Sequence, residues 1–325
     1  LQFLIQLPWV FRLERSFRPS FDARFDAARR TIRNAGPATV GRGVVQVSTY
    51  VDLILASLLV EGAVAVLGYA QALYVLPVSL FGMSVAASEL PELSRQRDQA
   101  KEVLQARVRA GIRQIAFFVI PSAVGYVLVG RWIVSALYER GDFAAADVAW
   151  THVVLIAYSV GLVASTATRL FSSSFFALGD TRTPALFAGV RVLIAAALGA
   201  ALMFAGAEFE VAGRPLSPAG HALGSGIAAG IEWGLLRRSR GRRIGDVTPA
   251  AGPLLRMTVA ALAAGGAGLG LGALLPPLDP ILAGAAVLGL FAVVYFGIAA
   301  LLGLTEAHHV AQRFRRIVGR GKQAS

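Results

Sequence analysis

Two long apolar runs, separated by a two-residue turn, constrain the fold of this chain more than any other feature. The runs are Ala38–Val60 and Ala63–Ser88, and the turn is Glu61–Gly62. Each run is long enough to cross a bilayer as a helix, which takes about 20 residues. Polar residues inside the runs must then face protein or a water-filled cavity, because lipid offers them no hydrogen bonds.

The rest of the chain repeats this pattern. Of its 325 residues 56% are hydrophobic and 15% are charged, against about 25% charged residues in soluble domains. The sequence therefore predicts an all-α, polytopic transmembrane helical bundle. Since Leu1 already lies in an apolar run, we expect further helices to precede it. The nine candidate spans are Leu1–Phe11, Ala38–Val60, Ala63–Ser88, Ile112–Val129, Trp150–Ala177, Ala185–Gly206, Ala219–Leu236, Leu254–Leu275 and Ile281–Gly303.

The connecting loops alternate in charge. Arginine and lysine gather in residues 12–33, 95–109, 182, 237–243 and 313–322, whereas the intervening loops hold acidic residues. The positive-inside rule makes the basic loops and the C-terminus cytoplasmic. The net charge of +12 does not indicate nucleic-acid binding, because the basic residues lie between apolar runs.

Several connections and helix positions carry further expectations. We divide the chain into residues 1–36, 37–184, 185–303 and 304–325. We expect a surface helix over Ser94–Arg109, an interfacial amphipathic turn over Arg131–Phe143 and an irregular turn over Phe204–Pro218. Pro77 and Pro121 permit kinks. Close helix packing is expected at four small-residue pairs, namely Gly220/Gly224, Gly226/Gly230, Gly266/Gly270 and Gly268/Gly272.

A polar stripe follows one face of the first run. Arg42, Gln46, Thr49 and Asp52 fall within about a third of the helix circumference. Asp52 and Gln71 lie nine and ten residues from Glu61, so both should sit near the midplane on adjacent helices. Two interpretations stay open: an ion or substrate site in a central cavity, or a carboxylate held by hydroxyl groups for packing.

Three arginines lie within or near apolar segments. Arg42, Arg169 and Arg191 can bind phosphate in a cavity, or they can extend to the membrane surface. We expect Arg169 and Arg191 at similar depth, because they flank one cytoplasmic turn at similar distances. Glu232 precedes the Arg237–Arg243 cluster by about one turn and is expected to pair with it.

Enzyme signatures are missing from the sequence. It contains no HExxH, GxSxG or P-loop motif and no cysteine, so we expect neither a catalytic function nor ATP-driven transport.

The run GYAQALYVLPVSLFGMSVAASELPELSR (Gly68–Arg95) resembles the MurJ/MviN lipid II flippase family. In that family a Tyr-Ala-x-Arg-Leu-Tyr-x-Leu-Pro run leads to Pro-x-Leu-Ser-Arg. Further similar motifs occur in order at Ile120–Phe143, Ile156–Leu162 and Phe175–Pro184. The family belongs to the multidrug/oligosaccharidyl-lipid/polysaccharide exporter superfamily and has fourteen helices in two lobes. The nine segments would be the sixth to fourteenth helices, with most of the N-terminal lobe missing.

The resemblance implies a function and a cargo. The cargo would be the undecaprenyl-pyrophosphate-linked peptidoglycan precursor, moved from the inner to the outer leaflet of the bacterial inner membrane by alternating access. Partners would be this lipid, membrane lipids and cell-wall synthesis proteins. No cofactor is expected apart from Na⁺ as a coupling ion. By resemblance, Asp52 matches a carboxylate of the sodium site found in some members, and Arg169 a basic residue. Our candidates are Arg42, Gln46, Gln71, Arg169 and Arg191 for substrate, and Asp52 and Thr49 for the ion.

The chain departs from the family pattern at named positions. The motif arginine falls on Ala72, and Ala195 and Gly199 lie where some members carry the Asn and Asp of the sodium site. Two alternatives therefore stay open: an exporter of another polyprenyl-linked glycan or of a drug, and a non-transporting scaffold of envelope synthesis.

Overall fold

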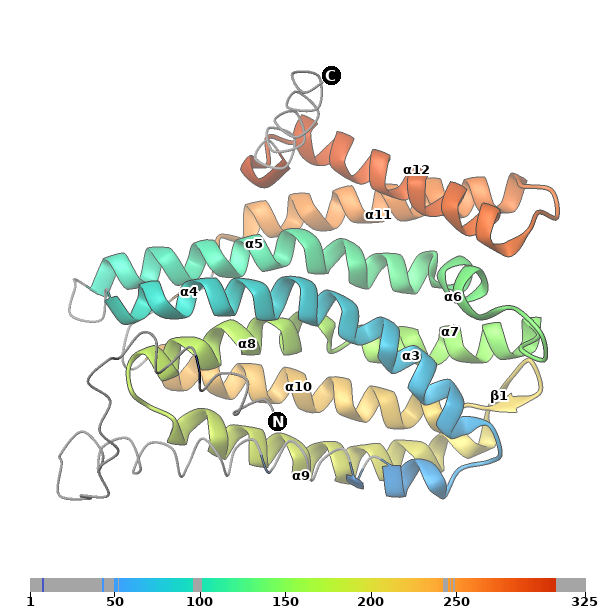
Figure 1. Cartoon of the computed structure of the whole chain (residues 1–325), viewed down its shortest axis with the longest axis horizontal. Coiled ribbons are helices and arrows are strands. Elements are labelled where there is room, and N and C mark those ends of the chain that lie inside the picture. Colours follow the sequence, from blue (N-terminus) through green and yellow to red (C-terminus); the bar gives the residue numbers. More distant parts are fainter. Residues whose placement is uncertain are drawn as a thin grey trace.

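The computed structural model describes residues 53–95, 101–241 and 249–307, together with single positions at 8, 43, 50, 51, 245 and 247. Leu1–Phe11, most of Ala38–Val60 and most of the 304–325 tail lie outside the described residues. Labels follow Figure 1. The elements are α3 (Ala63–Pro77), the π-helix η1 (Val78–Met83), α4 (Ser84–Arg95), α5 (Lys101–Leu128), α6 (Gly130–Tyr138), α7 (Ala145–Ser159), α8 (Leu162–Ala177), α9 (Arg182–Ala205), the 3₁₀ turn η2 (Gly206–Glu208), β1 (Glu210–Val211), β2 (Arg214–Pro215), α10 (Ser217–Gly241), α11 (Ala251–Leu274) and α12 (Pro280–Leu301).

The long helices lie side by side, and their connections gather at two opposite ends (Figure 1). The end of α4, the start of α5, the α8–α9 connection and the end of α12 lie at one end. Helix α6, the β1–β2 hairpin and the α11–α12 connection lie at the other. This arrangement matches the predicted alternation of loops between two faces. The end that carries the α8–α9 connection is called the basic end below.

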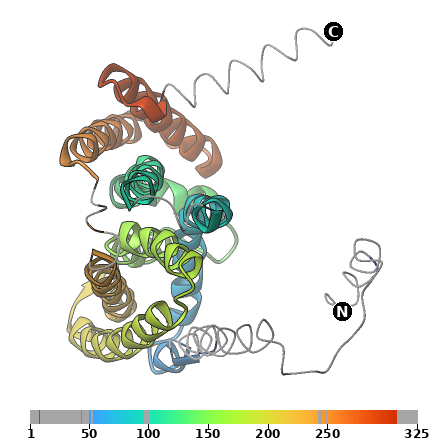
Figure 2. The same cartoon turned by 90° about the vertical axis from the view of Figure 1, so that its left-hand side faces the viewer.

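Helix α5 stands between two groups of helices. Seen along the helices in Figure 2, α11 and α12 lie on one side of it and α8, α9 and α10 on the other. Ile115 and Val119 of α5 belong to a core shared with α3, α7, α8 and α10. Ala116 and Phe117 belong to a second core with α11 and α12. One helix therefore joins the two cores.

The described residues contain five helices that are long and apolar enough to span a membrane, or six if the bent pair α7–α8 counts as one span. The bend between α7 and α8 measures 44°. The predicted number of nine spans is therefore not confirmed. The predicted span Ala219–Leu236 forms the core of α10, which is less apolar because protein, not lipid, surrounds much of it: α10 packs on α7, α8 and α9.

Two membrane-buried prolines each free a carbonyl group, and a tyrosine satisfies each one. A proline has no N–H, so the carbonyl four residues earlier loses its helical partner. Pro77 frees the carbonyl of Leu73, which accepts a 2.6 Å hydrogen bond from the Tyr126 hydroxyl of α5. Pro121 frees the carbonyl of Phe117, which accepts a 2.5 Å bond from the Tyr295 hydroxyl of α12.

The two prolines differ in their local effect. After Pro77 the helix widens into the π-helical turn η1, a rare form that occurs mostly as a single turn inside an α-helix. Helix α5 continues through Pro121 without a break. The helix type therefore changes after Pro77, and it does not change at Pro121.

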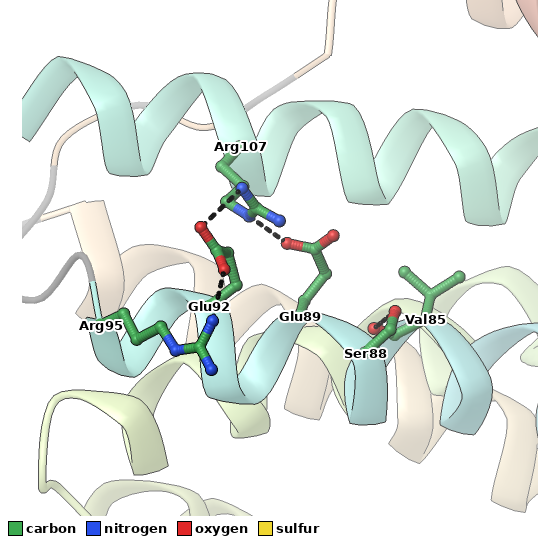
Figure 3. Close-up of polar contacts among 6 residues, drawn as sticks. All are labelled: Val85, Ser88, Glu89, Glu92, Arg95 and Arg107. Atoms are coloured by element: carbon green, nitrogen blue, oxygen red, sulfur yellow. Dashed lines mark hydrogen bonds and ion pairs between the residues drawn. The ribbon is translucent and has the colours of Figure 1, made fainter.

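The predicted surface helix over Ser94–Arg109 is wrong. Helices α4 and α5 both extend into this stretch and leave a short connection between them. Figure 3 shows Arg107 of α5 pointing between Glu89 and Glu92 of α4, with Nε 2.6 Å from Glu89 and Nη1 3.5 Å from Glu92. Arg95 contacts Glu92 from the other side at 3.8 Å. Ion pairs between these charged residues thus connect the two spanning helices α4 and α5. They do not belong to a separate surface helix.

Phe204–Pro218 is more regular than expected. It contains η2 and the antiparallel β1–β2 hairpin, in which Val211 pairs with Arg214. Ala212 and Gly213 both have positive φ, 51° and 73°, the combination of a two-residue type I′ turn. The predicted interfacial segment Arg131–Phe143, in contrast, forms the short helix α6, which crosses the end of the bundle (Figure 1).

Glycines set the contact between α9 and α10. A Cβ atom added to Gly224 would lie 2.5 Å from the backbone nitrogen of Gly199, and one added to Gly220 would collide with the carbonyl of Leu202. The predicted close packing at Gly220/Gly224 is therefore confirmed. Among the other predicted pairs, an added Cβ meets close neighbours at Gly226, Gly268 and Gly272, but meets nothing within 4 Å at Gly230, Gly266 and Gly270.

This contact predicts a difference between two alanine substitutions on one helix. Gly224→Ala should destabilise the protein by about 1–3 kcal/mol, because backbone atoms cannot move away from the new methyl group. Gly230→Ala, the matched control, should be neutral or stabilising by up to about 1 kcal/mol. Thermal unfolding of both purified variants in one detergent checks the difference, and equal melting temperatures would contradict it.

The tyrosine hydroxyls predict a second pair of effects. Tyr126→Phe and Tyr295→Phe should each lower stability by about 0.5–2 kcal/mol, because a freed carbonyl loses its donor. Tyr69→Phe is the control, since Tyr69 contacts Tyr138 and Phe143 through its ring. The same unfolding measurement applies. A loss in the control as large as in the other two would show that the hydroxyl bonds are not the cause.

Candidate functional site

An ion pair joins α9 and α10 inside the helical bundle. Nη1 of Arg191 lies 3.2 Å from Oε2 of Glu232. The Glu232 residue is 4% exposed, and the Arg191 side chain is 30% exposed. A carboxylate in such a place is costly unless it has a partner, so Arg191 is the group that permits Glu232 there.

Arg169 of α8 belongs to the same cluster. Helix α8, which carries Arg169, packs against α10, which carries Glu232, and Arg169 itself is exposed. Arg169 lies eight residues before the end of α8, Arg191 nine after the start of α9, and Glu232 nine before the end of α10. At 1.5 Å per residue, each is about 12–14 Å from the basic end. The two arginines thus lie at similar depth, as their spacing predicted.

The predicted pairing of Glu232 with the Arg237–Arg243 cluster is wrong. Five residues along a helix turn a side chain by about 140°, so Glu232 and Arg237 point to different faces. Arg237 lies over the ring of Trp233 instead, 5.8 Å from its centroid. The sequence analysis did not pair Arg191 with Glu232. The signal that could have indicated this pair is an acidic residue within a helix at the same depth as two arginines.

Gln71 and Ala72 lie on another surface. Both are exposed on α3, on the face opposite its buried residues Ala70 and Leu73. The remaining predicted site residues fall outside the described residues: Arg42, Gln46, Thr49 and Asp52. The polar stripe and the Asp52–Gln71 pair stay predictions.

Ala195 and Gly199, the positions that the family resemblance assigns to sodium ligands, lie in or beside close helix packing. Ala195 is buried. A Cβ added to Gly199 would lie 2.9 Å from Nδ1 of His221 on α10. Helix α9 therefore meets α10 closely at this point and offers no side-chain oxygen from either Ala195 or Gly199.

Two of the sequence motifs meet each other in space. Tyr74, from the motif of α3, stacks on Tyr158 of α7 with ring centroids 5.3 Å apart. The Tyr74 hydroxyl donates to Oγ of Ser165 on α8 at 2.6 Å. The motif that contains Tyr126 meets α3 through the freed carbonyl of Leu73. These motif residues hold helices together.

The motif FFALGDTRTP forms the tight turn between α8 and α9. Gly179 has φ of 78°. The N–H groups of Gly179 and Asp180 donate to the carbonyls of Phe176 and Phe175, which is the Schellman pattern of a helix end. The Asp180 carboxylate then accepts from the N–H of Thr183 at 3.1 Å and caps α9. This turn sets the heights of Arg169 and Arg191.

Comparison with known proteins identifies the family. The family model described as "Lipid II flippase MurJ" matches residues 1–276. A "Probable lipid II flippase MurJ" of Haemophilus influenzae is 28% identical over 245 residues, which cover 73% of this chain and 46% of the relative. The "Lipid II flippase MurJ" of Burkholderia cenocepacia is 29% identical over 328 residues, which cover 95% of this chain and 60% of the relative.

A solved structure agrees with these relatives. "Lipid II flippase MurJ, inward closed conformation" matches with a TM-score of 0.65 and 26% identity, over 79% of this chain and 51% of that one. The match spans less than half the length of relatives such as those of Rickettsia prowazekii (45%) and Haemophilus influenzae (46%). Together with the all-helical membrane fold and the ordered motifs, these matches show that the chain belongs to the lipid II flippase MurJ family.

Proposed function

We propose that the complete protein moves the undecaprenyl-pyrophosphate-linked peptidoglycan precursor from the inner to the outer leaflet of the bacterial cytoplasmic membrane. It would do so by alternating access of two lobes, with the C-terminus in the cytoplasm. Cell-wall synthesis proteins would be its partners. Family membership supports the cargo, and one observation carries the proposal for this chain: Arg169 and Arg191 lie at similar depth in an apolar bundle.

The chemistry of the cargo explains why such arginines matter. A pyrophosphate carries several negative charges that lose hydration in a membrane. Guanidinium groups form strong, directional hydrogen bonds to phosphate oxygens. The motif position Ala72 supplies no such charge on α3. The substrate-binding set of this proposal is therefore Arg42, Gln46, Gln71, Arg169 and Arg191.

The sodium proposal has weaker support from the residues present. Asp52 and Thr49 stay the proposed ion ligands on the first run. Ala195 and Gly199 add none from α9, and Gly199 lies against α10. The described residues therefore do not complete a sodium site, and no step of the proposed transport passes through that ion.

A complementation experiment tests the cargo. The complete gene product, expressed in bacteria depleted of their own lipid II flippase, should restore growth. A version truncated before α11 provides a negative control that keeps the motif region. Absence of rescue, with the protein shown by immunoblot to be in the membrane, would contradict the proposal and favour another cargo or a scaffold role.

The arginines require a sharper design than single alanine variants. Arg191→Ala alone would leave Glu232 buried without its partner, a change that can cost about 3–5 kcal/mol and confuses folding with transport. The variants for the same growth assay are therefore Arg191→Gln combined with Glu232→Gln, and Arg42→Ala. We expect at least a tenfold loss of colony formation from either one. Wild-type growth from both would contradict a substrate role for these arginines.

A further inference from the structure

The cluster of Arg169, Arg191 and Glu232 carries excess positive charge. Two guanidinium groups and one carboxylate leave one positive charge uncompensated within the part of the chain that the structure describes. Arg169 is exposed, so this charge can be reached from outside the three helices. An accessible excess positive charge attracts an anion. The buried Glu232 carboxylate by itself would not attract one.

Two buried polar atoms lie at the same height. Helices α8 and α10 run in the same direction (Figure 1) and touch where a Cβ on Gly161 would lie 2.5 Å from Cα of Gly226. Seven residues further, almost two turns, each helix presents the same face again. These positions are Thr168 and Trp233. Thr168 Oγ1 and Trp233 Nε1 are both buried and find no hydrogen-bond partner among the described residues.

The Arg191–Glu232 pair leaves donors available. The pair is joined by one contact, from Nη1 to Oε2, whereas a guanidinium carries five N–H donors. The buried hydroxyl of Thr168 and the indole N–H of Trp233 are donors as well. Among the described residues, the surroundings therefore contain several donors and one competing carboxylate, Glu232.

We propose that Arg169, Arg191, Thr168 and Trp233 form a binding site for a phosphate or pyrophosphate group, in which Glu232 is the resident counter-ion. In the empty site Glu232 neutralises Arg191. A bound oxyanion replaces Glu232 as the partner of Arg191 and also pairs with Arg169. The contact between Arg191 and the Glu232 carboxylate is then broken. The identity of the anion as part of the transported lipid rests on the proposed function, but the site itself does not.

Binding to the purified complete protein tests this role. The probes are inorganic pyrophosphate, farnesyl pyrophosphate and phosphatidylglycerol, titrated in detergent by isothermal calorimetry. The variants are Glu232→Gln, Arg191→Gln and Arg169→Gln. Asp147→Asn is the matched control, because Asp147 pairs with Arg214 at 3.4 Å at the opposite end of the bundle. Thermal unfolding verifies that each variant is folded.

The variants are expected to change the affinity for the pyrophosphate probes in opposite directions. Glu232→Gln should bind the pyrophosphate probes roughly tenfold more tightly than the unmodified protein, because the competing charge is gone. Arg191→Gln and Arg169→Gln should each bind them roughly tenfold more weakly, and Asp147→Asn should bind them equally. The pattern with inorganic pyrophosphate shows that the group itself is recognised. The pattern with farnesyl pyrophosphate alone shows that the lipid chain is needed as well.

Three results would overturn the proposal. One is a folded Glu232→Gln protein that binds the pyrophosphate probes no more tightly than the unmodified protein. Another is unchanged binding in both arginine variants. The third is the expected pattern with phosphatidylglycerol only, which would make the cluster a phospholipid site. Growth rescue without the affinity pattern would refute this site but not the transport function, whereas the pattern without rescue would refute the proposed cargo only.

Discussion

Satisfying backbone carbonyls in a dry environment is the constraint on which this bundle depends most. Pro77 and Pro121 each remove an N–H from a membrane helix, and an unpaired carbonyl in lipid costs several kcal/mol. The hydroxyls of Tyr126 and Tyr295 meet this need from neighbouring helices. The two bonds connect α3 to α5 and α5 to α12, so they tie one core to the other across α5. Each proline thereby specifies a helix neighbour as well as a local irregularity.

The recognisable sequence motifs build the scaffold. Tyr74, Gly179 and Asp180 make the contacts or turns that place helices. The charged cluster lies outside those motifs. It depends on one of them, because the α8–α9 turn sets the heights of Arg169 and Arg191. Arg191 and Glu232 come from helices whose sequences look ordinary for a membrane protein. In this chain, therefore, the most recognisable residues fix the scaffold, whereas the pairing of Arg191 with Glu232 is found only once the scaffold is known.

The all-helical class, the positions of the described spans and the turn at Glu61–Gly62 could be predicted, because apolar run length and turn residues are local properties. The shared depth of Arg169 and Arg191 followed from counting residues on both sides of one turn. The partner of Glu232 could not be predicted, since it depends on which helix packs beside α10. The surface helix over Ser94–Arg109 was wrong because charge alone does not separate a surface helix from spanning helices that extend beyond the apolar region. The low hydropathy of α10 likewise reflects neighbours that no local pattern reveals.

The most direct test of the transport claim follows the lipid itself. Cells depleted of their own flippase would express the complete protein, and an externally added enzyme that cleaves lipid II but cannot cross the membrane would report the outer-leaflet pool. The account predicts that cleavable lipid II returns to the level of undepleted cells. It also predicts that the Arg191→Gln/Glu232→Gln protein, present in equal amount, leaves that pool near the depleted level. An uncleaved pool with the unmodified protein in the membrane would contradict the assignment of lipid II as cargo.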